Sequence, residues 1–150
     1  MKYEIYTDLR IAHDLRVFEF VSIGKYGAVP KRIAFIPTVL PEVFNLAFGD
    51  INEDGEIDDY SISNNGDRNK ILATLAKVIE LYTDKYPERW IYFRGSTKER
   101  TRLYRMAIGI NLEELSEKFE IYVEVDSKNE FLPFQKNMQI IAFLIKRKID

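Results

Sequence analysis

One segment of the chain combines a glycine, two hydroxyl residues and several cations in an order that suits anion binding. Residues 90–105 read WIYFRGSTKERTRLYR, an apolar strand that leads through Gly95-Ser96-Thr97 into an arginine-rich helix. The start of a helix exposes backbone N–H groups that have no partner within the helix, and it carries a partial positive charge. Ser96 or Thr97 can cap this helix and leave other N–H groups for a phosphate or a carboxylate.

The predicted helix also carries a row of cations along one side. Because each residue turns an α-helix by about 100°, Lys98, Arg102 and Arg105 share one ridge, with Thr101 beside them. Arginine grips phosphate and carboxylate through paired hydrogen bonds, so phosphate is the ligand that this ridge favours. The predicted anion-binding residues are Gly95, Ser96, Thr97, Lys98, Arg102, Tyr104 and Arg105.

The opposite side of the same helix is predicted to pack against the core. Leu103, Ala107 and Ile110 lie on that side, and Arg100 lies nearer to it than to the ridge. Arg100 is therefore expected to matter more for folding than for binding.

Aromatic residues accompany the cations, and a nucleobase can stack on such rings. Tyr92, Phe93 and Tyr104 are close to the arginines along the chain. Since successive residues of a strand point to opposite faces, Tyr92 and Phe93 cannot face the same ligand. Most of these rings are expected in the core.

No catalytic signature accompanies the predicted anion site. Gly-Ser-Thr is not the phosphate-loop pattern, which needs a Lys-Ser/Thr pair after a longer glycine loop, and the glycine spacing of dinucleotide sites is absent. The chain has no cysteine, and His13 is its single histidine, expected on the surface. Thiol chemistry, paired imidazoles and histidine-based metal sites are thereby excluded, and no catalytic residue is assigned.

Two other interpretations of the basic segment stay open. In the first, the arginines pair with the acidic loop of residues 50–59, and Ser96 only caps the helix. In the second, Tyr104 beside Arg105 acts on RNA phosphate, as in ribonuclease toxins that need no histidine, because such groups can stabilise a phosphorane.

An acidic segment, residues 50–59, contains carboxylates and no basic residue. From Asp50 to Asp58 it follows the calcium-loop pattern, with oxygen ligands at loop positions 1, 3, 5 and 9 and glycine at position 6. Position 12 is Ser61 instead of a bidentate carboxylate, and the flanks resemble strands. Because Asp54-Gly55 supplies turn chemistry, a carboxylate-rich hairpin explains the same residues. No metal is assigned, and weak calcium binding by this loop stays an open question.

Composition limits the classes of protein that remain. With 150 residues, 46% of them hydrophobic, the chain can bury the core of one domain, which we expect to span residues 1–150. A net charge of −2 disfavours broad nonspecific binding of nucleic acid. The sequence contains neither a signal peptide nor a run of about 20 apolar residues, so a cytoplasmic location with no membrane contact is expected. The oligomeric state is not predicted.

The first half of the chain has the pattern of β structure, with short apolar runs separated by turn residues. Residues 16–23 and 32–36 are predicted to form strands, and residues 24–27, Gly-Lys-Tyr-Gly, suit the turn of a hairpin. Residues 43–48 and 57–62 are predicted to form a second pair of strands, joined across the acidic segment.

In the second half, helices alternate with strands. Asp67 is predicted to cap a core helix whose apolar stripe is Ile71, Leu72, Leu75, Val78, Ile79 and Tyr82, and Pro87 ends it. Residues 90–93 form a strand, the basic helix ends near residue 110, and Asn111 with Glu114 resembles a capping box for a short helix. Residues 120–125 and 138–146 are the closing strands. This order predicts a two-layer α+β fold in which two main helices pack on a mainly antiparallel sheet.

Three segments together resemble an uncharacterised family of short bacterial proteins found mainly in Bacteroidetes. They are SNNGDRNKILATLAKVI at 63–79, IYFRGSTKERTRLYRMAI at 91–108 and AFLIKRK at 142–148. The positions that match the family pattern are Asn65, Gly66, Asp67, Gly95, Ser96, Thr97, Arg100, Thr101, Leu103, Tyr104 and Arg105. Because the family is a domain of unknown function, the resemblance implies a single α+β domain in a bacterial cytoplasm and no particular activity.

The leading hypothesis from the sequence is a non-catalytic binding module with no cofactor. Its site at residues 95–105 would receive a phosphate-bearing ligand or a nucleic acid. The alternatives are the histidine-free phosphodiester-cleaving enzyme and a protein-interaction domain whose basic ridge docks an acidic partner.

Overall fold

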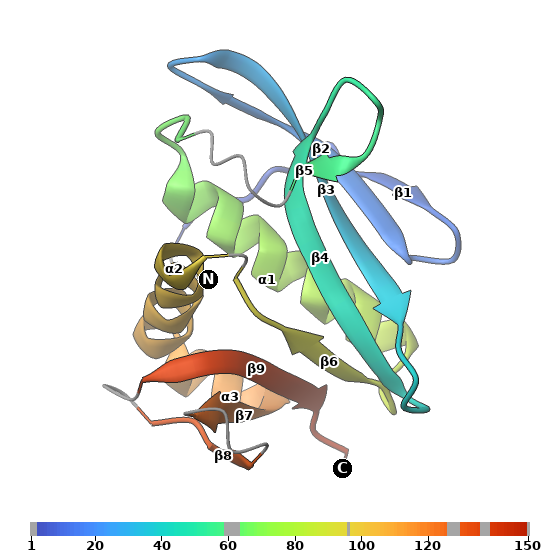
Figure 1. Cartoon of the computed structure of the whole chain (residues 1–150), viewed down its shortest axis with the longest axis vertical. Helices are drawn as coiled ribbons and strands as arrows, with labels where there is room; N and C mark the ends of the chain where they lie inside the picture. Colours follow the sequence, from blue (N-terminus) through green and yellow to red (C-terminus); the bar gives the residue numbers. More distant parts are fainter. Residues whose placement is uncertain (1–2, 59–63, 96, 126–129, 136–138, 150) are drawn as a thin grey trace. The chain divides into compact units, whose positions relative to one another are not determined.

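A computed structural model describes residues 3–58, 64–95, 97–125, 130–135 and 139–149 (Figure 1). These residues form a mostly antiparallel, nine-stranded sheet and three helices, so the predicted α+β class is confirmed. Strands that neighbour one another follow the order β1-β2-β3-β4-β6-β9-β7-β8, with β5 beside β4. The chain divides into two compact units, and β4 and α1 each begin in one unit and end in the other. The expectation of a single domain stays a prediction.

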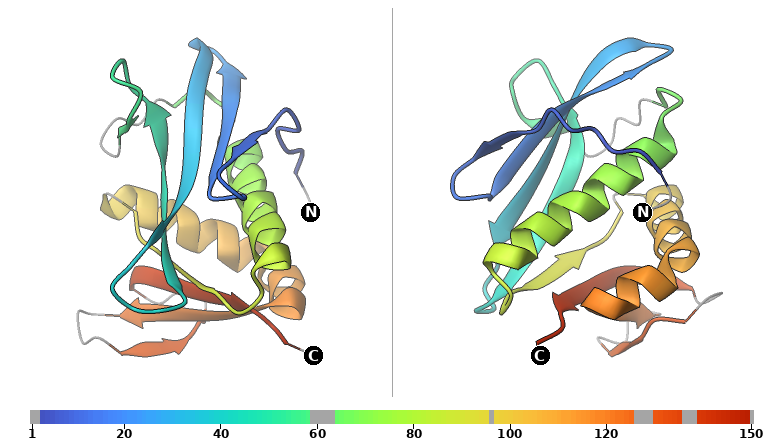
Figure 2. Two further views of the ribbon diagram at one scale, coloured as in Figure 1. Left: turned by 90° about the vertical axis from the view of Figure 1, so that its right-hand side faces the viewer. Right: turned by 180° about the vertical axis from the view of Figure 1, so that it is seen from behind.

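Unit 1 consists of Met1–Ile36 and Leu46–Tyr82. Its elements are β1 (Arg10–Ala12), β2 (Val17–Gly24), most of β3 (Gly27–Pro37), the larger part of β4 (Val43–Ile51), β5 (Ile57–Asp58) and most of α1 (Arg68–Lys85). Helix α1 lies across one face of β2 and β3 (Figure 2).

The core of unit 1 follows from the alternation of side chains along its strands and from the apolar stripe of α1. Alternate residues of β2 and β3 point toward α1, among them Phe18 opposite Ile33 in the strand register. The ring of Tyr82 on α1 stacks on Phe35, with ring centroids 3.8 Å apart. The predicted apolar stripe of α1 is buried except at Leu72, which is partly exposed. The helix ends at Lys85, two residues before Pro87, as predicted.

Both predicted hairpins of unit 1 are present among its described residues. Gly24 pairs with Gly27 across a two-residue turn, and the backbone φ of Gly27 is 82°, a conformation that glycine adopts without strain. The second hairpin pairs Ile51 of β4 with Ile57 of β5. The predicted strand over residues 57–62 lies within the described residues only as far as Asp58.

The turn of the acidic segment is organised by an asparagine. The side-chain oxygen of Asn52 accepts hydrogen bonds from the N–H groups of Asp54 at 2.9 Å and Glu56 at 3.0 Å. Asp50, position 1 of the calcium pattern, is buried and forms an ion pair with the ammonium group of Lys31. The hairpin interpretation of this segment is therefore confirmed.

The Asn-Gly-Asp sequence before α1 ties the β2–β3 hairpin to the start of that helix. The carbonyl of Asp67 accepts the first helical hydrogen bond, from the N–H of Ile71 at 3.0 Å, so the predicted N-cap position is confirmed. One oxygen of its carboxylate, however, accepts hydrogen bonds from the hydroxyl groups of Tyr6 and Ser22, and the other accepts none from the described residues, the helix included. Gly66 has a φ of 84°, which explains the glycine between the two polar residues.

Unit 2 consists of Pro37–Asn45 and Thr83–Asp150. Its elements are the start of β4, the last turn of α1, β6 (Trp90–Phe93), α2 (Lys98–Ile110), α3 (Leu112–Lys118), β7 (Phe119–Val125), β8 (Phe131–Pro133) and β9 (Ile140–Arg147). Strand β4 pairs with β6 in parallel, and the other pairs in this unit are antiparallel. The last strand, β9, lies between β6 and β7.

Helices α2 and α3 lie against one face of this sheet (Figure 2). On that face the ring of Phe93 stacks on Phe143 at 5.0 Å and meets the ring of Tyr104 of α2 edge-on at 5.6 Å. Helix α3 begins after Asn111, as predicted, but the side chain of Asn111 makes no capping hydrogen bond, so the predicted capping box is wrong in this respect.

Candidate functional site

The predicted anion site lies in unit 2, where β6 turns into α2. The N–H of Gly95 donates a hydrogen bond to the hydroxyl of Thr101 at 3.0 Å, which folds the connection back on the first turn of the helix. A side chain at position 95 has no room, because an added Cβ would lie 2.3 Å from the backbone nitrogen of Thr101. Position 95 therefore needs a glycine because the chain packs closely there, and not because the loop has to be flexible.

Thr97 caps α2, as the sequence predicted for Ser96 or Thr97. Its hydroxyl accepts a hydrogen bond from the N–H of Arg100 at 3.1 Å, and its carbonyl accepts one from the N–H of Thr101 at 3.1 Å. Ser96 lies outside the described residues. The first two N–H groups of the helix, those of Lys98 and Glu99, donate to no described residue. They are the groups that can receive an anion.

The exposed cations gather around this helix start. Lys98 and Arg102 are exposed and stand one helical turn apart, and Arg94 is exposed just before Gly95. None of the three forms an ion pair with another described residue. Arg105, the third member of the predicted ridge, is partly buried and has contacts of its own. The site is thus an open cationic surface on a capped helix start.

The buried side of α2 agrees with the prediction at Arg100 and differs from it at Leu103. Arg100 and Tyr104 are 8% and 6% exposed, one turn apart, and Ile108 continues the same buried line. Leu103, predicted to pack, is only partly buried, and the side chains of Ala107 and Ile110 lie outside the described ones. Arginine can bury the apolar stem of its side chain, and tyrosine can bury its ring. Arg100 and Tyr104 can therefore pack on the buried side of α2.

Tyr104, a predicted site residue, and Thr101, predicted to lie beside the ridge, both have structural contacts. The hydroxyl of Thr101 is turned to Gly95, so the residue does not lie on the open ridge. The ring of Tyr104 packs against Phe93, and the role of Tyr104 in anion binding stays a prediction. Sequence periodicity missed the Gly95–Thr101 contact, because a close approach between a loop residue and a helix residue leaves no periodic signal in the sequence.

Histidine and possible metal ligands supply no second candidate site in the part of the chain that the structure describes. His13, the single histidine, lies in an exposed turn between β1 and β2, as expected. Within the described residues, no three histidine, aspartate or glutamate side chains group to hold a metal. None of the three described helices is long and apolar enough to cross a membrane.

Fold and site together define an α+β protein in which exposed cations surround the start of a helix, and Gly95 packs closely against the first turn of that helix. Comparison with protein families is more specific. The model described as Family of unknown function (DUF6934) matches residues 2–148, and the chain belongs to this family. The expected membership of a family of unknown function is confirmed. No curated protein and no solved structure matches the chain.

Proposed function

We propose that this protein is a non-catalytic binding module that holds an anion at the start of α2. The ligand is a phosphate-bearing molecule, a nucleotide or nucleic acid, which sits on the N–H groups of Lys98 and Glu99. Lys98 and Arg102 supply charge-assisted hydrogen bonds from the side. A bacterial origin and a cytoplasmic location, which the sequence resemblance implies, belong to the same proposal.

The observation that supports this proposal is that the exposed cations near the start of α2 form no ion pairs with described residues. Lys98, Arg102 and Arg94 are exposed and make no ion pair with a described carboxylate, next to N–H groups that have no described acceptor. Charges that served only solubility would not need to gather where a helix dipole already attracts an anion.

The test is binding of inorganic phosphate and of a nucleotide panel to the full chain, followed by calorimetry and by amide chemical shifts. Wild type should bind, with affinity that falls as salt rises, and the shifts should concentrate at Gly95, Lys98 and Glu99. A Lys98→Ala, Arg102→Ala variant should lose about tenfold or more in affinity, because each charge-assisted hydrogen bond contributes about 1.5 kcal/mol or more.

A matched control carries the same change of charge elsewhere. Arg68 and Lys148 are exposed residues outside the site, and the Arg68→Ala, Lys148→Ala variant should bind as wild type does. Equal loss of affinity in both variants would mean that net charge, and not a site, attracts the anion. Circular dichroism confirms that both variants are folded.

A protein-interaction domain is the second candidate, and an exposed loop favours it. Val39 and Leu40 are 99% and 60% exposed between Pro37 and Pro41. The loop is ordered by Thr38, whose hydroxyl accepts from the N–H of Leu40 at 3.1 Å and donates to the carbonyl of Val43 at 2.7 Å. Fixed apolar side chains in water are typical of docking surfaces. A chain that co-purifies with wild type and is lost in Val39→Ser would support this candidate.

The histidine-free phosphodiesterase gains no support from the position of Tyr104. A ring that packs on Phe93 is poorly placed to attack or protonate an RNA phosphate together with Arg105.

A further inference from the structure

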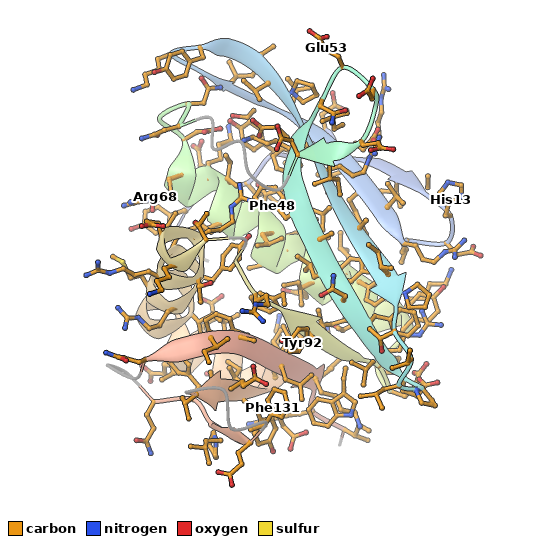
Figure 3. The ribbon with its side chains drawn as sticks, viewed as in Figure 1. His13, Phe48, Glu53, Arg68, Tyr92 and Phe131 are labelled. Carbon is orange, nitrogen blue, oxygen red and sulfur yellow. The ribbon has the colours of Figure 1, made fainter. Side chains whose placement is uncertain are left out.

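The sheet of unit 2 carries aromatic rings on the face opposite to its helices. Trp90 and Tyr92 of β6, Tyr122 of β7 and Phe131 of β8 supply them. The ring centroids of Trp90 and Tyr122 are 5.8 Å apart, and those of Tyr92 and Phe131 are 6.4 Å apart. Tyr92 and Phe131 are labelled in Figure 3, and the strand registers place them on one side of the sheet. The prediction that Tyr92 and Phe93 face opposite sides is confirmed, since Phe93 packs on the helix side.

These rings are partly open to solvent. Phe131 is 38% exposed, and Trp90, Tyr92 and Tyr122 are of intermediate exposure. Of the helices described in unit 2, both α2 and α3 lie against the other face. A contiguous group of partly exposed rings, on the sheet face opposite to α2 and α3, is more than the fold of the described part of this unit requires, and such groups mark binding surfaces.

One cation lies on this face, and others follow β6 along the chain as far as the start of α2. The ammonium group of Lys146 stands 5.2 Å from the centre of the Trp90 ring. Arg94, two residues after Tyr92, is exposed and leads through Gly95 to Lys98. Rings and cations therefore follow β6 from its first residue to the proposed anion site.

The carboxylates of the same face lie along β7. Glu120 is opposite Lys146 in the strand register, and Glu124 is opposite Phe131. The phosphate groups of a ligand would be repelled by the carboxylates of β7 and attracted by the cations near β6. A ligand with several phosphates is therefore expected to lie along β6. Glutamate can also accept hydrogen bonds from the amino groups of bases.

We infer that the ligand of the proposed site is a single-stranded nucleic acid, with bases stacked on Trp90 and Tyr92 and phosphates held by Arg94 and the start of α2. The inference rests on the proposed function and names its ligand class. Stacking on aromatic side chains accepts any base, so binding is broad in sequence, while duplexes are excluded because their bases are already stacked.

Trp90 is the single tryptophan of the chain, so its fluorescence reports on this face without a label. Titration with oligothymidylate and oligoadenylate should quench the emission of wild type, less so as salt rises. Anisotropy of labelled oligonucleotide then compares variants. Tyr92→Ala should weaken binding about tenfold, since a stacked base is lost, whereas Tyr26→Ala, which removes an exposed ring of unit 1, should have no effect.

The outcomes separate this inference from the proposed function. Phosphate binding at Lys98 and Arg102 without quenching by oligonucleotides would overturn the inference and leave the proposed function standing. The inference also falls if folded Tyr92→Ala binds oligonucleotide as wild type does, if a duplex binds equally well, or if a neutral oligosaccharide quenches Trp90 in its place. If neither phosphate nor oligonucleotide binds, both proposals fail.

Discussion

The side-chain oxygen of Asn65 accepts a hydrogen bond from the backbone N–H of Tyr26 at 2.7 Å, although the two residues are far apart along the chain. The amide nitrogen of Asn65 donates to the carbonyl of Gly27 at 3.0 Å and to the hydroxyl of Ser22 at 3.1 Å. The buried side-chain amide of Asn65 thus forms hydrogen bonds with the end of the β2–β3 hairpin, and these bonds hold the hairpin to the segment before α1.

Asn65→Ala is therefore expected to cost about 2 kcal/mol, because several polar groups around the hairpin lose their partner at once. The neighbouring Asn64 is exposed and makes one long hydrogen bond, from the N–H of Gly66 at 3.3 Å. Asn64→Ala should stay within about 0.5 kcal/mol of wild type. Urea unfolding of the two variants measures both costs, and equal values would contradict the role of Asn65.

Two glycines of one segment should respond to alanine in opposite ways. Gly95→Ala forces a methyl group to within 2.3 Å of the Thr101 nitrogen and should cost about 2 kcal/mol or more. Gly109 lies inside α2, where an added Cβ would meet only the Phe134 ring, at 4.0 Å. Gly109→Ala should be neutral or stabilise by up to about 1 kcal/mol, since alanine favours the helix. Thermal unfolding distinguishes the two, and a stable Gly95→Ala would refute the close packing at the site.

Tyr6 is expected to make stability depend on alkaline pH. Burial, and then its hydrogen bond to Asp67, raise the pKa of the Tyr6 hydroxyl above the ordinary value of 10.0. A pKa that is higher in the folded state means that the contribution of Tyr6 is complete below pH 10.0 and is lost as the pH rises through the folded value.

The measurement is the urea midpoint of wild type and Tyr6→Phe from neutral pH to above pH 10.0. Tyr6→Phe should be less stable at neutral pH and should lose less stability in alkali. Tyr26→Phe, at an exposed hairpin tyrosine, serves as the control and should follow the wild-type curve. Parallel curves for Tyr6→Phe and wild type would show that the hydroxyl is not linked to folding.

The orientation of α1 predicts a contrast between two of its residues. Leu75 is buried against the sheet of unit 1, and Leu75→Ala should cost about 2 to 5 kcal/mol through lost burial and the cavity it leaves. Lys77 lies off the stripe, with its ammonium group 3.8 Å from Glu80, and such surface pairs contribute about 1 kcal/mol at most. Denaturant unfolding in which Lys77→Ala was the more damaging change would contradict this packing.

The acidic hairpin is expected to give no calcium switch. Asp50 is already paired with Lys31, and the side-chain oxygen of Asn52 is occupied by two N–H groups of the turn. Calcium would have to displace these contacts without the carboxylate that usually completes the loop. Thermal midpoints in chelator and in millimolar calcium should nearly coincide. A rise of about 4 °C or more, which corresponds to roughly 1 kcal/mol of linked binding, would contradict the hypothesis.

Local patterns predicted most of the fold. The turn at Gly24 and Gly27, the stripe from Ile71 to Tyr82 and the strand before Gly95 each have a short-range cause, namely permissive φ, helical period and alternation. The insertion of β9 between β6 and β7 has no local cause. Strand order depends on pairing between distant segments, which a single sequence does not display.

The candidate site was predicted in its position and only partly in its details. The cap at Thr97 and the open side of Lys98 and Arg102 follow from helix geometry. The burial of Arg100 follows from the same geometry, which places it nearer to the packing side, and from the apolar stem of arginine. The partial exposure of Leu103, which was expected to pack, does not follow from it. The aromatic face of unit 2 was also hidden, because Trp90, Tyr122 and Phe131 come together through strand pairing.

The position of β9 has a consequence for synthesis. During translation, β6 and β7 are synthesised before residues 140–147, the strand that pairs with both of them. Until that strand arrives, each presents an edge able to pair with a foreign chain. Premature termination would remove β9, which is a central strand of this sheet and not an edge strand. The sheet of unit 2 can therefore be completed only when β9 is available, and chains that lack β9 should expose the edges of β6 and β7.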